Sequence, residues 1–308
     1  MNRAFLFPGQ ASQHVGMGED LYKRYELATD RYELAQNVTG IDLKKICFEG
    51  PEDELKQTTI TQPAIFVHSV IVYELLKTKS ILPAAVAGHS LGEYSALVAA
   101  GAINFEDGLK LVHLRGKLMQ ESGNKRPGTM AAIIGLSQEQ VGDLCRKFDG
   151  KGIIQEANFN SPGQIAISGD AETVRNAIPM AKDMGAKKAV ELDVSGAFHS
   201  PLMQDAQEKF KQALEQAVFK DAIIPVYTNV EANPTTDREK IKKLLYQQLT
   251  KPVLWQQSVE AMINDGFDQF YEIGPGKVLK GLLKRINRSV PCQNIGKVEE
   301  IEQSGDMT

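Results

Sequence analysis

The residues best suited to chemistry in this 308-residue chain form the pentapeptide Gly88-His89-Ser90-Leu91-Gly92. A short apolar run, 84–87, precedes it, and a helix-like stretch of small residues, 94–100, follows it. A strand, a sharp turn and a helix in this order form a nucleophile elbow, whose glycines avoid a collision that a Cβ would cause. The serine hydroxyl then stands at a helix N-terminus, where backbone N–H groups face a developing anion. The pattern predicts Ser90 as a nucleophile.

A serine hydroxyl needs a base to accept its proton, and the chain offers five histidines. His68 lies within an apolar helical stretch and is interpreted as a packed core residue. His89 adjoins the serine, but the turn directs neighbouring side chains apart. His199 lies in a loop before a helix that begins with proline, a place where catalytic histidines are common. His14 and His113 are the alternatives to it.

No acid can be assigned to orient the histidine from the sequence. Asp193 and Asp205 lie near His199, but they fit a strand end and a solvated helix face better. A backbone or amide carbonyl orients an imidazole equally well, and residues 247–249 are a candidate segment. Arg115 lies among apolar residues of a helical stretch after the elbow. It is either a structural arginine or a clamp for a substrate carboxylate, which a guanidinium binds in a bidentate fork.

The composition is that of an ordinary globular enzyme, with 42% hydrophobic and 24% charged residues. A formal net charge of −4 argues against nucleic acid as a partner. The continuous apolar runs are shorter than the ~18 residues of a membrane span, and the N-terminus does not fit a signal peptide. The three cysteines do not have the spacing of metal ligands, so no metal site is predicted. Their odd number predicts reduced thiols in a cytoplasmic protein.

Alternating strands and helical segments predict an α/β protein with a parallel sheet. Residues 1–123 and 197–290 are assigned to this catalytic core, in which a helical stretch is expected at 18–37, a helix from Pro201 and a strand at 223–228. Residues 124–196 follow the order β-α-β-β-α-β, which is a ferredoxin-like pattern, and are interpreted as an inserted subdomain. Its first helix is expected to begin in a capping box of Ser137 and Gln140. The acidic residues 291–308 show no core pattern and are expected to form a C-terminal tail.

Several separated motifs carry a resemblance to one family. The chain resembles malonyl-CoA:acyl carrier protein transacylases and the acyltransferase domains of fatty acid and polyketide synthases, from residue 3 to about 290. The matching segments besides the elbow are Phe7-Pro8-Gly9-Gln10, Gly16-Met17-Gly18, Gln62-Pro63-Ala64, Glu93-Tyr94, Arg115-Gly116, Met119, Asn158 to Gln164, Ala197-Phe198-His199-Ser200 and Glu272 to Gly276.

The resemblance implies an α/β-hydrolase-like core that carries a ferredoxin-like subdomain, and a ping-pong reaction without a bound cofactor. Ser90 would take malonyl from malonyl-CoA and pass it to the phosphopantetheine thiol of an acyl carrier protein. His199 would act as base and then as acid, held by a main-chain carbonyl near Gln248. The backbone N–H groups of Gln10 and Leu91 would form the oxyanion hole.

The resemblance also implies how the acyl group is chosen. Arg115 would hold the free carboxylate of malonyl, which disfavours acetyl groups. Phe198, directly before the histidine, would narrow the space beside the malonyl α-carbon and disfavour methylmalonyl. Met119 and Asn160 are the other expected substrate-binding residues.

Acyl carrier proteins are acidic, so a basic docking face is expected. Lys187 and Lys188 are the candidates nearest the cleft, and the basic side of the final helix, 277–288, is a second candidate. The expected setting is fatty acid synthesis by a monomer, with no membrane partner. The alternatives are a trans-acting acyltransferase of a polyketide assembly line, a serine thioesterase or other hydrolase, and a partner module with an idle Ser90.

Overall fold

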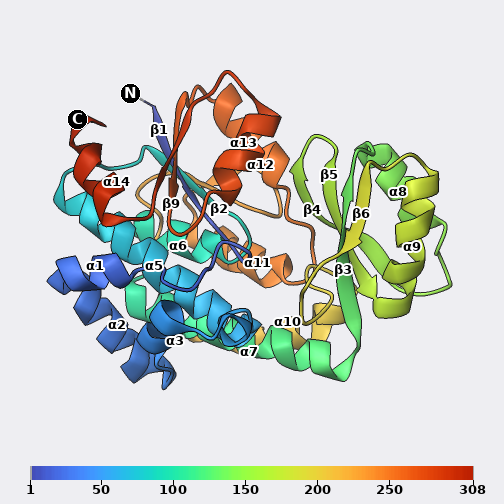
Figure 1. Cartoon of the computed structure of the whole chain (residues 1–308), viewed down its shortest axis with the longest axis horizontal. Helices are drawn as coiled ribbons and strands as arrows, with labels where there is room; N and C mark the ends of the chain where they lie inside the picture. Colours follow the sequence, from blue (N-terminus) through green and yellow to red (C-terminus); the bar gives the residue numbers. More distant parts are fainter. Residues whose placement is uncertain (1, 308) are drawn as a thin grey trace.

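The chain folds around two separate sheets, which lie side by side in the computed structural model (Figure 1). The structure describes residues 2–307, and the side chains of residues 2–305. The larger sheet has the strand order β10-β9-β1-β2-β7-β8, in which β8 pairs antiparallel at one edge and the other pairs are parallel. The smaller sheet has the order β4-β5-β3-β6 and is antiparallel throughout. The predicted α/β class with a parallel sheet is confirmed.

The strands of both sheets are short, and the helices lie between them along the chain. The strands of the larger sheet are β1 Arg3–Phe7, β2 Ala85–Gly88, β7 Val226–Tyr227, β8 Pro234–Thr235, β9 Gln269–Ile273 and β10 Cys292–Ile295. The strands of the smaller sheet are β3 Gly128–Ile134, β4 Ile154–Ser161, β5 Gln164–Asp170 and β6 Lys188–Glu191. The α-helices are α1 Glu19–Arg24, α2 Glu26–Thr39, α3 Leu43–Glu49, α4 Glu52–Leu55, α5 Thr58–Thr78, α6 Gly92–Ala99, α7 Phe105–Lys125, α8 Gln138–Arg146, α9 Ala171–Asp183, α10 Gln204–Gln216, α11 Arg238–Gln248, α12 Trp255–Asn264, α13 Val278–Ile286 and α14 Val298–Gln303.

Strand β1 shows that the larger sheet is covered on both faces. Phe5 and Phe7 pack into the main core, which helices α5, α6 and α7 share. Ala4 and Leu6, on the opposite face, pack into a second core with α12 and α13. Both pairs are fully buried. A parallel strand buried on both faces reads as a continuous apolar run, which is the pattern of residues 4–7.

Helix α5 is a long helix of the core and is mostly apolar. By length and composition it is the one helix within residues 2–307 that passes for a membrane span, with a mean hydropathy of 1.3 over its most apolar window. Of that window, 89% is buried inside the protein. Its hydrophobicity is therefore used in packing against α6 and α7.

The smaller sheet packs on α8 and α9 by one face (Figure 1). Strand β3 divides its side chains accordingly, because successive residues point to opposite faces. Ala131 and Ile133 face the helices, whereas Met130 and Ala132 line a cavity between the two sheets. Helix α8 begins with the predicted capping box around Ser137, whose hydroxyl accepts from the Gln140 N–H at 3.2 Å.

Some elements differ from the sequence-based expectations. The helical stretch expected at 18–37 is two helices, because Tyr25 takes an extended conformation between α1 and α2. The strand expected at 223–228 is reduced to the two residues of β7. Residues 201–203, expected to begin the next α-helix, form a 3₁₀ turn ahead of α10.

The expectation of a C-terminal tail over residues 291–308 is wrong for most of that segment. Strand β10 pairs in parallel with β9, and α14 follows it. Ile295 is 2% exposed, and Ile301 is fully buried in the main core. Two apolar residues in a four-residue strand are too few for a periodic pattern, so the segment is stabilised by its pairing and not by a local signal. Thr308, like Met1, lies outside the described residues.

Candidate active site

Ser90 lies in the sharp turn between β2 and α6, as the elbow pattern predicts. Its φ of 51° is in the left-handed region, which a residue with a Cβ adopts only where the surroundings enforce it. Asn229 supplies that enforcement, because its Oδ1 accepts from the Ser90 N–H at 2.7 Å and its Nδ2 donates to the Gly88 carbonyl at 2.6 Å. Asn229 was not predicted, because an amide 139 residues from Ser90 in the chain gives no local signal.

The glycines of the elbow are required by close backbone contacts. A Cβ on Gly92 would lie 2.0 Å from the carbonyl oxygen of Phe7, at the end of β1. A Cβ on Gly88 would lie 2.0 Å from the backbone of Gly92. The turn is therefore pressed against β1, and Ser90 is held at the carboxyl ends of the two central strands.

Replacing Gly92 with alanine is expected to lower the free energy of unfolding by about 4 kcal/mol or more, because neither backbone can move away without breaking the sheet. The matched control is Gly281→Ala in α13, where a Cβ meets nothing within 4 Å. That control should raise stability by about 0.5 to 1 kcal/mol. Urea unfolding measures both, and a Gly92→Ala variant as stable as the control contradicts the prediction.

His199 is the histidine that contacts the hydroxyl of Ser90. Its Nε2 lies 2.9 Å from Ser90 Oγ, and its Nδ1 lies 2.7 Å from the main-chain oxygen of Gln248. Because a carbonyl can only accept, Nδ1 carries the proton and Nε2 is free to accept from the serine. Burial, and then the charge of Arg115, lower the pKa of His199 to about 3. The ring is therefore neutral at neutral pH, as a base must be.

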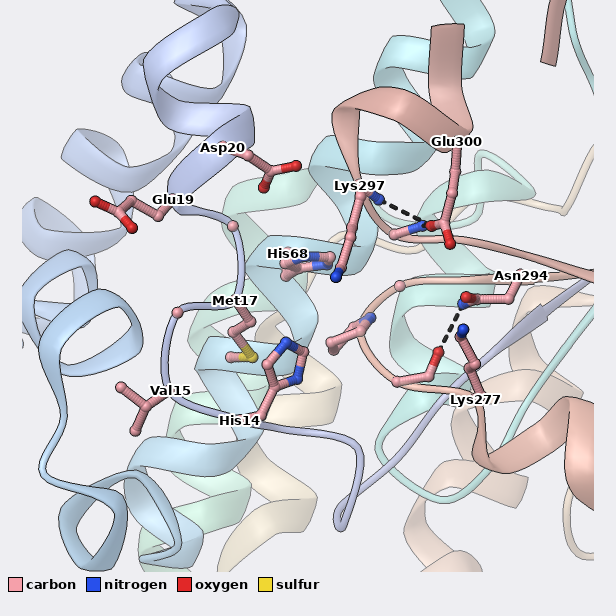
Figure 2. Close-up of a pocket in the computed structure, with 16 residues that line it drawn as sticks. His14, Val15, Met17, Glu19, Asp20, His68, Lys277, Asn294, Lys297 and Glu300 are labelled. Atoms are coloured by element: carbon pink, nitrogen blue, oxygen red, sulfur yellow. Dashed lines mark hydrogen bonds between the residues drawn. The ribbon is translucent and has the colours of Figure 1, made fainter. Parts of the chain in front are cut away.

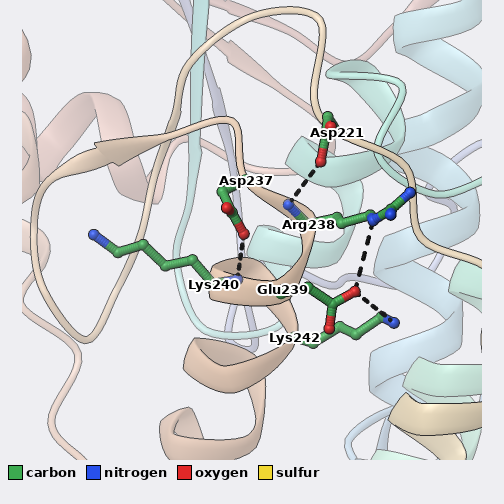
Figure 3. Close-up of polar contacts among 6 residues, drawn as sticks. All are labelled: Asp221, Asp237, Arg238, Glu239, Lys240 and Lys242. Atoms are coloured by element: carbon green, nitrogen blue, oxygen red, sulfur yellow. Dashed lines mark hydrogen bonds and ion pairs between the residues drawn. The ribbon is translucent and has the colours of Figure 1, made fainter.

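Helix α11 provides the carbonyl that orients His199. Gln248 is the last residue of α11, where main-chain carbonyls lack partners within the helix. The beginning of the helix is fixed by two aspartates, with Asp237 accepting from the Lys240 N–H at 2.7 Å and Asp221 from the Arg238 N–H at 3.2 Å (Figure 3). An ordered helix end replaces the acid that the sequence does not provide.

Arg115 extends from α7 to the nucleophile and is 1% exposed. Its Nη2 donates to Ser90 Oγ at 3.0 Å and to Gln248 Oε1 at 3.0 Å, and its Nη1 donates to Gln62 Oε1 at 2.7 Å. Each of these contacts is to a neutral acceptor, so among the side chains of residues 2–305 no carboxylate is in direct contact with the guanidinium. A buried cation in this state is suited to a substrate that brings a carboxylate.

The nucleophile opens into a cavity of about 590 Å³ between the larger and the smaller sheet. Gln10 and Leu91 both line it. Within residues 2–307 neither backbone N–H donates a hydrogen bond, so both are available to an oxyanion. Gly9 allows this approach, since a Cβ there would lie 2.4 Å from the main-chain oxygen of His89.

The remaining predicted substrate residues form the cavity wall. Met119 is 2% exposed, and its Sδ accepts from Gln62 Nε2 at 3.3 Å. Phe198 is 5% exposed and lines the same space. Asn160, at the end of β4, lies with its Oδ1 2.9 Å from His89 Nε2. This contact joins the elbow to the smaller sheet.

His14, His68 and His113 lie away from Ser90. His14 and His68 line a second cavity of about 600 Å³, one wall of which is the loop that follows β1 (Figure 2). His68 is 1% exposed, in agreement with the packed role inferred for it, and burial lowers its pKa to about 4. His113 is on α7 and lines neither cavity. Of the three candidate bases, only His199 is within reach of Ser90.

The predicted docking lysines lie outside the catalytic cavity. Lys187 and Lys188 are exposed at the beginning of β6, whereas the segment after β6 lines the cavity through Leu192 and Val194. The cation at the cavity rim is instead Lys56, which pairs with Glu52 at 2.9 Å. Sequence reasoning did not single out either residue.

Three further polar residues around the catalytic groups were also missed. Glu93, on α6, is 1% exposed and contacts the Gln248 amide. Gln62 holds Arg115, and Gln155 Nε2 donates to the main-chain oxygen of His199 at 2.6 Å. Glu93 and Gln62 lie within segments that match the family. A search of those segments for polar residues among buried neighbours would have found both.

Comparison with known proteins places this site in a family. An acyl transferase domain model matches residues 4–303. A malonyl CoA-acyl carrier protein transacylase of Bacillus subtilis is 45% identical over 300 residues, which cover 97% of this chain and 95% of that protein. The structure of an acyl carrier protein S-malonyltransferase from Vibrio cholerae is 40% identical, covers 98% of this chain and 99% of its own, and superposes with a TM-score of 0.94.

A further solved structure contains a carrier protein. It is a malonyl-transacylase in complex with the holo form of a type II polyketide synthase acyl-carrier protein, and it is 39% identical to this chain. The likeness covers all of both chains, with a TM-score of 0.96. On sequence and structure together, this chain belongs to the family of acyl transferase domains that includes the malonyl CoA-acyl carrier protein transacylases.

Proposed function

We propose that this protein transfers a malonyl group from malonyl-CoA to the phosphopantetheine thiol of an acyl carrier protein, by way of a malonyl ester on Ser90. The observation that carries the proposal is the position of Arg115, whose Nη2 lies 3.0 Å from Ser90 Oγ in a buried cavity. A simple ester or thioester hydrolase has no use for a buried cation beside its nucleophile. An acyl group that ends in a carboxylate does, because it pairs with that cation.

Acylation begins when Ser90 Oγ attacks the thioester carbonyl and gives its proton to His199 Nε2. The N–H groups of Gln10 and Leu91 then donate to the oxyanion, and each such donor contributes about 3 kcal/mol at comparable sites. Collapse of the tetrahedral intermediate breaks the C–S bond, and the imidazolium protonates the coenzyme A thiolate. Arg115 holds the malonyl carboxylate throughout. In turning to that carboxylate, the guanidinium gives up its hydrogen bond to Ser90 Oγ.

The second half-reaction repeats these steps with a different thiol. His199 accepts the proton of the phosphopantetheine thiol, whose sulfur attacks the ester carbonyl in the same oxyanion hole. The C–O bond to Ser90 breaks, and the imidazolium returns the proton to Oγ. No bound cofactor is required. Phe198 narrows the cavity beside the nucleophile, which supports a preference for malonyl over methylmalonyl.

The setting we propose is fatty acid synthesis in the cytoplasm. A polyketide assembly line is the second candidate, because a solved relative is bound to a carrier protein of that kind. The chemistry is the same in both settings. We also propose that the larger sheet is an α/β-hydrolase-like core of residues 1–123 and 197–290, to which β10 and α14 add a last strand and helix. The order β4-β5-β3-β6 supports a ferredoxin-like subdomain over 124–196.

Incubation with malonyl-CoA should place one malonyl group on the peptide that contains Ser90. Intact-protein and peptide mass spectrometry detect the adduct, and acetyl-CoA and methylmalonyl-CoA are run beside it for comparison. Ser90→Ala should carry no label. A malonyl group on another residue, or none on the wild-type protein, rejects the proposed function.

We propose that Lys187 and Lys188 help to dock the acidic carrier protein, since both are exposed on the smaller sheet that forms one wall of the cavity. Replacing both with glutamate should raise the KM for carrier protein about tenfold and leave acylation by malonyl-CoA unchanged. The same double change at Lys243 and Lys211, on exposed helix surfaces, is the control. An unchanged KM eliminates this docking site.

A further inference from the structure

The carboxylate of Glu93 is buried behind the catalytic groups. Its Oε2 accepts from Gln248 Nε2 at 2.8 Å and from the Asn229 N–H at 3.2 Å. It is 1% exposed and does not line the catalytic cavity, so it does not contact substrate. Burial raises the pKa of Glu93 to about 7, because the ionised carboxylate is less stable in the interior than in water. Burying this group therefore lowers the stability of the fold, and we expect it to have a function.

Two acceptors decide which way the Gln248 amide points: the carboxylate of Glu93, and the main-chain oxygen of Ser90, to which Nε2 donates at 3.1 Å. An amide has a donor end and an acceptor end, and its orientation follows from its partners. Because an ionised carboxylate only accepts, Gln248 must turn its NH₂ toward Glu93. Its Oε1 then faces Arg115, at 3.0 Å from Nη2. The reverse orientation would set NH₂ against the guanidinium and oxygen against the carboxylate.

We propose that Glu93 is a positioning residue, which holds the Gln248 amide in one orientation and thereby fixes the guanidinium of Arg115 for the acyl carboxylate. The inference rests on the proposed function, because only an acyl group with a carboxylate depends on that guanidinium. Gln62 supports the other side of Arg115 at 2.7 Å. Loss of Glu93 should therefore tilt the guanidinium without releasing it.

The first test is Glu93→Gln, assayed at pH 8, where the wild-type carboxylate is mostly ionised. The substituted amide can donate toward Gln248, so the reversed orientation is opposed by the Ser90 carbonyl and no longer by a carboxylate as well. Acylation of Ser90 by malonyl-CoA should lose about tenfold in kcat/KM, while acylation by acetyl-CoA changes less than about threefold. A merely structural role would lower both acylation rates together, so the ratio of the two rates is the decisive measurement.

The second test removes the same link from its other end. Gln248→Met keeps the main-chain oxygen that holds His199 but takes away the amide between Glu93 and Arg115. It should show the same loss of malonyl selectivity, and it tests the link if Glu93→Gln does not fold. Glu74→Gln is the matched control. It removes a carboxylate that lies outside the site and accepts two hydrogen bonds from Arg31, at 2.7 and 2.9 Å.

The outcomes separate this inference from the function on which it rests. If the wild-type protein takes up no malonyl, the proposed function fails. If the wild-type protein is labelled but Glu93→Gln keeps the wild-type ratio of malonyl to acetyl acylation, the positioning role of Glu93 is overturned. Equal losses for both acyl groups in Glu93→Gln overturn it as well.

Discussion

The His199→Ala variant should acylate Ser90 about 10⁴-fold more slowly than the wild-type protein at neutral pH. The imidazole is the group within 2.9 Å of Ser90 Oγ that can accept its proton, and without it the attacking oxygen stays protonated. Rapid-quench labelling with malonyl-CoA measures the rate directly. Because serine and histidine act as a unit, Ser90→Ala/His199→Ala should be no slower in thioester turnover than Ser90→Ala alone.

A residual rate within tenfold of wild type would contradict this assignment of the base. His14→Ala is the control, because His14 lines the second cavity and should leave acylation unchanged. The low pKa of His199 adds a further check, since its protonation should not limit the rate between pH 6 and pH 8. A loss of activity over that range has to come from another group.

Replacing Arg115 with alanine should reduce malonyl transfer by about 10²-fold or more and raise the relative rate of acetyl transfer. The malonyl carboxylate would then be buried without its cation, at a cost of about 3–5 kcal/mol. Acetyl has no carboxylate and loses nothing at this position. Parallel kcat/KM measurements with malonyl-CoA and acetyl-CoA give the two effects.

Arg115→Lys distinguishes charge from geometry. The ammonium keeps the charge but lacks the fork that contacts Gln62 and Gln248 together. It should recover part of the malonyl rate and little of the discrimination. If Arg115→Ala lowers malonyl and acetyl transfer equally, Arg115 is a structural residue and the specificity argument fails.

Local patterns predicted the elements that depend on local sequence. The elbow was predictable because glycines, a strand and a helix adjoin Ser90, and the capping box of α8 because both partners lie within four residues. The β-α-β-β-α-β order of elements along residues 124–196 followed from the alternation of strand and helix patterns. Strand β10 was not predictable, because its stability comes from pairing with β9.

The polar groups around the site could be predicted only in part from the sequence. From the residues alone His199 was one of three possible bases, and the structure selects it by distance. Asn229 and Gln155 act through amides that reach across more than one element, and no local pattern marks such residues. The resemblance to a family points to Ser90, His199 and Arg115 as the reacting groups that we propose, whereas the contacts of Asn229 and Gln155 could be found only in three dimensions.

The oxygen that orients His199 has a genetic consequence. It belongs to the peptide backbone of residue 248, so no single codon change removes it. Substitutions that disable the base should instead cluster where they displace the end of α11, and mutational scanning of residues 238–252 would show them as a periodic pattern of buried positions.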